Sequence, residues 1–299
     1  MERTDNGRDR TLAAAGCILT AMAVIGFIDQ YVGRLAETSS VWSFVLVRTA
    51  IIFALALGFA ILARRPLRVR RWRGVLARAA VMGAALVIYF GALGFLSVAE
   101  AAAGLFTAPI WVLLLSVAWG LRVGPVRMVA VALGFAGVLL VLAPDPATTS
   151  AWLILPVLAG ALYGLGALAT REWCEGEGAL ELSLANFGAQ AVWSALAVAV
   201  IAVVGAGDTF VTRGWVWPDG PTLAICAMQA AGSLVAVTLL TKGYQLTQAS
   251  LASVFEYSVL GFSALFGWIV AGQATGPWGL LGLGLIALAG SLIALRARA

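Results

Sequence analysis

The sequence predicts an all-α, polytopic membrane protein with ten transmembrane helices. Its composition supports this fold class, because 62% of the 299 residues are hydrophobic and only 11% are charged. The mean hydropathy of +0.99 also lies far outside the range of soluble globular domains. A large soluble helical bundle would need charged outer faces on most of its helices, and the sequence does not supply them.

Ten apolar segments follow one another with little sequence between them. Each is long enough to cross a bilayer, which takes about 20 helical residues. The separating segments are rich in arginine, glycine, proline and acidic residues, which end helices and face water. The first apolar run is long enough to be a span, so a cleavable signal peptide is not expected. The predicted spans are residues 12–32, 41–63, 75–97, 101–121, 126–143, 151–171, 181–205, 221–241, 249–271 and 277–295.

The cationic residues predict the orientation in the membrane, because short loops rich in lysine and arginine stay in the cytoplasm. With the N-terminus inside, the outer loops hold only Arg34 and Arg213, and Arg48 lies within a span. Both termini are therefore expected in the cytoplasm. The pI near 9.6 then reflects topology and contact with anionic lipid, and no nucleic-acid partner is expected. The cytoplasmic segments hold 16 of the 19 cations: Arg3, Arg8, Arg10, Arg64, Arg65, Arg68, Arg70, Arg71, Arg73, Arg78, Arg122, Arg127, Arg171, Lys242, Arg296 and Arg298.

The two halves of the chain resemble each other. Residues 94–111 align with residues 243–260 at an offset of 149, and residues 134–142 align with residues 287–295 at an offset of 153. Many secondary transporters are built from such repeats and hold their substrate between them.

A third alignment extends the repeat to the start of each half. At an offset of 138, residues 24–28 overlay residues 162–166, and Arg48 falls opposite Asn186. Five helices per half is an odd number, so the halves must have opposite orientations in the membrane. The expected organisation is a cytoplasmic tail, a first five-helix repeat, and a second, inverted repeat with a short C-terminal tail, over residues 1–11, 12–146 and 147–299.

Several features stand out at defined places within the repeats. They are Arg48 in the second helix, the small-residue run 99–109 that ends in Pro109, the matching run 248–258, and Gly137 and Gly290 in the fifth and tenth helices.

In their order and spacing these features resemble the drug/metabolite transporter superfamily, in its ten-helix branch of small-metabolite exporters. A Gly-Glu pair expected at the end of the fourth helix of each repeat appears here as Gly120-Leu121 and Gly272-Gln273. The resemblance implies alternating access around a central cavity between the repeats. Bacterial amino-acid exporters, including those for aromatic amino acids, look like the nearest functional relatives.

Glu256 and Tyr257 interrupt the apolar segment 249–271. An ionised carboxylate facing lipid costs about 2.5–3.5 kcal/mol or more, so Glu256 should face the bundle interior. Three interpretations stay open. Glu256 could line a cavity and meet a substrate ammonium or carry a coupling proton, it could pair with Arg48, or it could reach the cytoplasmic interface as a helix-end carboxylate.

Other polar and aromatic residues at membrane depth complete a candidate substrate-binding set. Asn186, Gln190 and Trp193 recur at steps of four and three, so they share one face of their helix. Amide hydrogen bonds that only hold helices together would explain the same pattern. The candidate set is Glu256, Tyr257, Tyr89, Trp111, Tyr163, Asn186, Gln190, Trp193 and Gln229.

Arg48 and Pro109 are expected to act structurally or in gating. The planar guanidinium of Arg48 could bind a substrate carboxylate, but the recurrence of an arginine there across the resembled family favours a role in holding the second helix. Pro109 removes a backbone hydrogen bond within a predicted span. It would therefore give the fourth helix either a pivot for opening the cavity or a static bend.

The sequence argues against enzymatic chemistry. It contains no histidine, its three cysteines are scattered without CxxC spacing, and it has no P-loop motif. No metal or cofactor is therefore expected. We predict a transporter that exports small metabolites, most of all amino acids, across a bacterial-type inner membrane, with a multispecific drug efflux transporter as the alternative. The driving force, including proton coupling, and the oligomeric state stay open.

Overall fold

The computed structural model describes residues 2–93, 96, 98–143 and 151–296. Over these residues the chain contains helices and connecting segments but no strand. Ten helical segments are long and apolar enough to cross a membrane, and each begins and ends within a few residues of its prediction. The ends of the third and eighth spans differ most, because the third helix ends at Ala92 and the eighth continues to Leu246. The predicted fold class, an all-α polytopic membrane protein, is confirmed.

Some spans consist of more than one helix. The first contains α1, the short helix η1 and α2, and the fourth and ninth are each divided in two. In chain order the elements are α1 (Glu2–Ile28), η1 (Asp29–Tyr31), α2 (Val32–Thr38), α3 (Val41–Leu62), α4 (Trp72–Ala92), α5 (Val98–Leu105), α6 (Ala108–Ala118), α7 (Pro125–Leu142), η3 (Ala151–Leu153), α8 (Ile154–Glu172), α9 (Ala179–Val204), α10 (Gly220–Leu246), α11 (Ala249–Glu256), α12 (Ser258–Ala271) and α13 (Pro277–Arg296).

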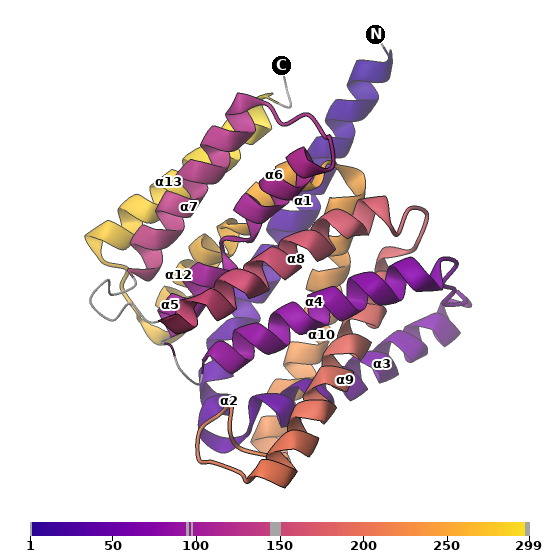
Figure 1. The fold of residues 1–299 in the computed structure, drawn as a ribbon, viewed down its shortest axis with the longest axis vertical. Helices are drawn as coiled ribbons and strands as arrows, with labels where there is room; N and C mark the ends of the chain where they lie inside the picture. Colours follow the sequence, from indigo (N-terminus) through magenta and orange to yellow (C-terminus); the bar gives the residue numbers. More distant parts are fainter. Residues whose placement is uncertain (1, 94–95, 97, 144–150, 297–299) are drawn as a thin grey trace.

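The helices pack in pairs that the two halves share. Helix α1 packs along α10, α4 packs along α8, and α7 and α13 lie side by side at one edge (Figure 1). In a five-plus-five repeat, each helix has a counterpart five spans away in the other half. The counterparts of α1 and α10 are α8 and α4, so the α1–α10 pair corresponds to the α4–α8 pair. In the pairs α7–α13 and α3–α9, the two partners are counterparts of each other. This is the packing that a five-plus-five repeat requires.

Local sequence explains where several helices begin and end. Ser40 caps α3 by accepting a hydrogen bond at 3.1 Å from the backbone N–H of Ser43. Asp219 caps α10 in the same way, accepting from the N–H of Thr222 at 2.9 Å. Hydrogen bonds to Thr222 hold the pKa of the Asp219 carboxyl below its usual value. Helix α12 ends at Ala271 and is followed by Gly272, whose φ of 65° favours glycine.

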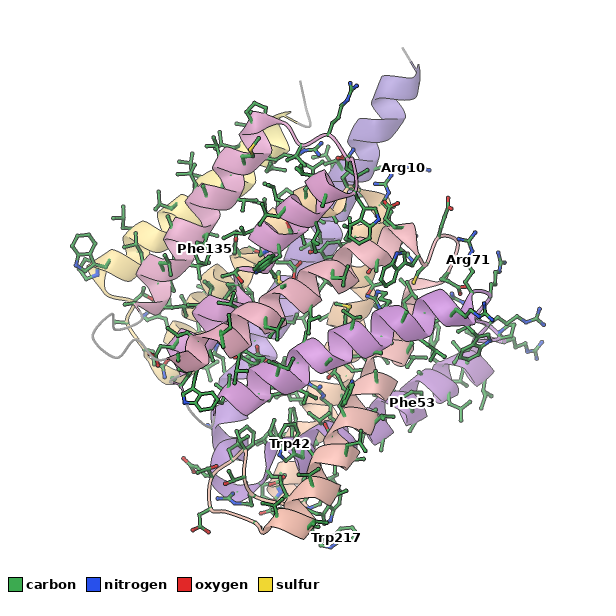
Figure 2. The ribbon with its side chains drawn as sticks, viewed as in Figure 1. Arg10, Trp42, Phe53, Arg71, Phe135 and Trp217 are labelled. Atoms are coloured by element: carbon green, nitrogen blue, oxygen red, sulfur yellow. The ribbon has the colours of Figure 1, made fainter. Side chains whose placement is uncertain are left out.

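The bundle has two chemically different ends. Arg10 and Arg71 lie at one end, toward the upper right of Figure 2, whereas Trp42 and Trp217 lie toward the opposite, lower end. Helix α1 begins and α13 ends at the top of Figure 1. Arg71 belongs to the arginine-rich segment between α3 and α4, so this segment and the start of α1 lie at the same end, the one predicted to be cytoplasmic.

Loops from different halves are hydrogen-bonded at both ends of the bundle. At the arginine-rich end, the buried carboxylate of Glu177 accepts the backbone N–H groups of Arg70 at 2.9 Å and Arg71 at 2.5 Å. At the other end, the guanidinium of Arg213 donates to the carbonyl of Ser39 at 2.8 Å.

The fourth and ninth spans are both interrupted near their middle. Helix α5 ends at Leu105 and α6 begins at Ala108, while α11 gives way to α12 at Tyr257. Pro109 lies in the first turn of α6, where a missing backbone N–H removes no helical hydrogen bond. Pro109 therefore stands at the start of the second helix of a divided span, and its role as a pivot or a static bend stays a prediction.

Candidate functional site

A cavity of about 220 Å³ lies between the two halves of the molecule. The first half contributes α1, η1, α3 and α4 to its wall, and the second half contributes α8, α9 and α10. Its apolar lining includes the rings of Phe90 and Phe187. The polar lining residues are Asp29, Arg48, Arg78, Tyr163, Thr170, Asn186, Gln190, Gln229, Ser233, Thr241 and Tyr244.

The structure brings four of the predicted binding residues to this cavity, namely Tyr163, Asn186, Gln190 and Gln229, together with Arg48. Gln229 already has a structural partner, because its amide donates to the carbonyl of Ile28 at 2.7 Å. Ile28 is the last residue of α1, so Gln229 satisfies a carbonyl where the first span departs from regular α-helix.

Arg48 forms a cluster with the predicted residues of α9. It donates from Nη2 to the amide oxygen of Gln190 at 2.9 Å, and its guanidinium lies 4.9 Å from the ring centre of Phe44 and 5.7 Å from that of Phe187. Its Nε and the amide oxygen of Asn186 are buried without a hydrogen-bond partner among the described residues. Such groups are costly unless satisfied, so this cluster has an unused donor and an unused acceptor for a ligand.

Arg78 is a site residue that the sequence analysis missed. It was assigned to a cytoplasmic segment, but α4 begins at Trp72 and encloses it, and the side chain is only 2% exposed. Its Nε donates to the hydroxyl of Thr170 at 2.7 Å, and its Nη1 to the carbonyl of Leu182 at 3.3 Å. The available signal was its place inside the predicted span 75–97, where an arginine rarely faces lipid.

Asp29 also lines the cavity and was not predicted. It lies in η1, directly after α1 ends. An acidic residue inside a predicted span was itself a signal, since such residues rarely face lipid. With Asp29, Arg48 and Arg78 on its wall, the cavity has acidic and basic side chains that could bind opposite charges on one ligand.

Glu256 lies behind two tyrosines of the cavity wall. Its carboxylate accepts a hydrogen bond from the hydroxyl of Tyr163 at 2.9 Å and another from the hydroxyl of Tyr244. Glu256 therefore neither pairs with Arg48 nor lies exposed at the membrane interface. Glu256 contacts the cavity through tyrosines of α8 and α10, of which only Tyr163 was in the predicted set.

The remaining predicted residues do not line the cavity. Tyr257 is fully buried in a separate apolar cluster with Val138, Leu260 and Ile286. Tyr89 stacks at a tilt against Phe90, with ring centres 5.3 Å apart.

Two tryptophans of the candidate set also lie elsewhere. Trp111 of α6 lies against Gly164 of α8. Trp193 is 37% exposed and lines a groove on the outer surface. The shared face predicted for α9 therefore reaches the cavity at Asn186 and Gln190 but not at Trp193.

Ten spans packed around a polar cavity form an arrangement that small-molecule membrane transporters share. Residues 12–143 match the EamA-like transporter family. This match covers the first half of the chain, and the resemblance to the drug/metabolite transporter superfamily is confirmed.

Two known proteins extend this comparison. A protein of Rhizobium johnstonii described as a riboflavin transporter is 29% identical over 198 residues, which cover 66% of this chain and 61% of that protein. A solved structure, titled only as the crystal structure of a protein, has a TM-score of 0.74 at 19% identity. The match covers 95% of this chain and 97% of the other, and it supports the fold alone.

Proposed function

We propose that this protein is a secondary transporter that exports small metabolites, above all amino acids, by alternating access around the central cavity. The match to a transporter family supports transport rather than catalysis. The position of the cavity between the two halves suits a mechanism in which the halves rearrange about a bound substrate. In this proposal the membrane is a bacterial-type inner membrane and both termini are cytoplasmic.

The charged lining of the cavity carries the amino-acid assignment. A zwitterionic amino acid presents a carboxylate and an ammonium, and the cavity wall holds guanidinium groups at Arg48 and Arg78 and a carboxylate at Asp29. Guanidinium binds carboxylate through paired hydrogen bonds. A multispecific drug efflux transporter, the alternative function, would not require fixed partners for both charges.

Aromatic amino acids fit the remaining lining best. The rings of Phe90, Tyr163, Phe187 and Tyr244 face the cavity. Aromatic pairs prefer offset or edge-to-face contact and add about 0.5–1.5 kcal/mol beyond their buried area.

Riboflavin, or a similar heteroaromatic compound, is a second candidate substrate. The relative described as a riboflavin transporter favours it, and the same aromatic rings could stack on its ring system. Riboflavin carries no carboxylate or ammonium, so its transport would not depend on Asp29 or Arg78. This difference makes the two candidates separable.

The test is efflux from preloaded proteoliposomes of radiolabelled amino acids and of riboflavin, with wild type, Asp29→Asn and Arg78→Gln. For an amino acid we expect each variant to lose about tenfold or more in rate, equivalent to about 1.4 kcal/mol or more. The exposed Arg122→Gln serves as the matched control and should transport normally. Riboflavin efflux that ignores both variants would favour the second candidate, and absence of amino-acid movement would contradict the first.

A second experiment addresses proton coupling at Glu256. Glu256→Gln keeps the shape of the side chain but cannot exchange a proton. We expect this variant to lose the dependence of amino-acid efflux on an imposed proton gradient, measured at two pH values. Efflux that is unchanged by the variant and insensitive to the gradient would make the protein a facilitator with a structural Glu256.

A further inference from the structure

A second hollow lies on the outer surface of the bundle, away from the central cavity. It has a volume of about 660 Å³ and lies between α3, α4 and α9. Its walls are apolar, and exposed side chains such as Phe53, Leu76 and Val192 border it. Phe53 is labelled on α3, at the lower right side of the bundle in Figure 2. A bilayer would present its hydrocarbon chains to this surface.

The groove has a polar end where α9 begins. Glu181, the third residue of α9, lines the groove there together with Leu67 and Val69 of the loop between α3 and α4. Glu181 is only 6% exposed, and its Oε2 has no hydrogen-bond partner among the described residues. A carboxylate can accept about four hydrogen bonds, so this buried oxygen leaves acceptor capacity unused.

Positive charge surrounds this end of the groove. Arg65 lies 3.5 Å from Oε1 of Glu181, and its side chain is 52% exposed. The same loop contains Arg64, Arg68 and Arg70, which are also exposed. A ligand that carries an anion next to a hydrogen-bonding cation would complement the arginines and the buried carboxylate together.

We propose that this groove binds one phospholipid whose headgroup contains both a phosphate and a primary amine, as phosphatidylethanolamine does. An acyl chain lies along the apolar walls, the phosphate lies at Arg65, and the ammonium donates to Glu181. A choline headgroup has no N–H to donate, and a glycerol headgroup has no positive charge for the carboxylate. The inference does not depend on which substrate the central cavity transports.

Two variants separate the headgroup contact from the acyl-chain contact. Glu181→Gln removes the negative charge beside the headgroup. Gly188→Leu fills the groove, because a Cβ at Gly188 would lie 3.6 Å from the ring of Phe53, an ordinary contact that leaves the helices in place. Gly284→Leu is the matched control, since nothing lies within 4 Å of a Cβ at that position in α13.

The measurement is the thermal unfolding midpoint of detergent-purified protein with added dioleoyl phosphatidylethanolamine, phosphatidylcholine or phosphatidylglycerol. We expect phosphatidylethanolamine to raise the midpoint of wild type and Gly284→Leu most. Glu181→Gln should lose this preference among lipids, and Gly188→Leu should lose the stabilisation by all three. Equal stabilisation of wild type by the ethanolamine and choline lipids, or by ethanolamine and glycerol lipids, would overturn the headgroup assignment. If Gly188→Leu retained the stabilisation by lipid, the assignment of the acyl-chain site to this groove would be overturned.

Discussion

The two interrupted spans occupy corresponding positions in the repeats but differ in chemistry. Between α5 and α6, the hydroxyl of Thr107 donates to the carbonyl of Gly104 at 2.6 Å. Between α11 and α12, Ser258 makes the same kind of bond to Phe255 at 2.6 Å. Only the second break also carries a carboxylate, Glu256, held by tyrosines of two other helices. The repeat thus shares the backbone interruption, while the second half alone adds a group that can exchange a proton.

The helices that follow the two breaks are also packed in a shared way. A Cβ on Gly164 of α8 would lie 3.0 Å from the carbonyl oxygen of Ala108 in α6, and a Cβ on Gly26 of α1 would lie 2.9 Å from the backbone nitrogen of Ser263 in α12. These glycines correspond at the offset of 138 residues. The absence of a side chain allows close approach of helices in both halves.

Removal of the carboxylate should produce the largest difference between the breaks. Glu256→Leu leaves the hydroxyls of Tyr163 and Tyr244 without their acceptor, at a cost of about 1–3 kcal/mol for each buried donor. We expect the free energy of unfolding, measured by chemical denaturation in detergent, to fall by about 2–6 kcal/mol. Thr107→Val, at the corresponding position, should cost about 0.5–1.5 kcal/mol. Equal costs would show that the two breaks are energetically alike.

Loss of either tyrosine hydroxyl should have the next largest effect. Tyr163→Phe and Tyr244→Phe each remove one hydrogen bond to Glu256, for an expected cost of about 1.5–3 kcal/mol when the acceptor is charged. The double variant should depart from additivity because both donors share one acceptor. Tyr89→Phe is the control and should change stability by less than about 0.5 kcal/mol. Strict additivity in this cycle would contradict a shared carboxylate.

The repeat-related glycines should respond alike, which tests the shared half of the comparison. Gly26→Ala and Gly164→Ala each push a methyl group against a neighbouring helix, for an expected loss of about 1–3 kcal/mol of unfolding free energy. Gly16→Ala meets nothing within 4 Å, so it should gain up to about 1 kcal/mol from helix propensity. A loss at only one of the two packed glycines would break the equivalence of the halves.

Pro109→Ala should have the smallest effect. The proline lies in the first turn of α6, so its replacement mainly increases the entropy of the unfolded chain. The expected loss is about 0.4–1 kcal/mol, measured by the same denaturation. A loss of about 3 kcal/mol or more, the size associated with proline in a helix interior, would mean that Pro109 determines the geometry of the break.

The sequence predicted the spans well because hydropathy over about 20 residues is a local property. It did not predict the neighbours of Glu256, since Tyr163 lies 93 residues away and only tertiary packing brings the two together. Arg78 was missed for a simpler reason. Its predicted span began at residue 75, which put Arg78 near the membrane interface. The helix begins at Trp72, so Arg78 lies deeper in the bundle than the prediction placed it.

Trp193 illustrates the limit of helical periodicity. Spacing correctly placed Asn186 and Gln190 together on the cavity wall, but it cannot say how far along a helix the cavity extends. The packing of α9 against α4 ends the cavity before Trp193 and directs that ring to the outer groove. A pattern within one helix therefore predicted a common direction, whereas the site depended on the neighbouring helix.

The bond from Glu177 to the loop between α3 and α4 has a consequence for sequence variation. Glu177 accepts the backbone N–H groups of Arg70 and Arg71, not their side chains. Every amino acid except proline supplies that N–H. Homologues can therefore exchange the arginines of this loop, and adapt the surface charge to their own membranes, while the closure of this end is preserved as long as the glutamate is retained.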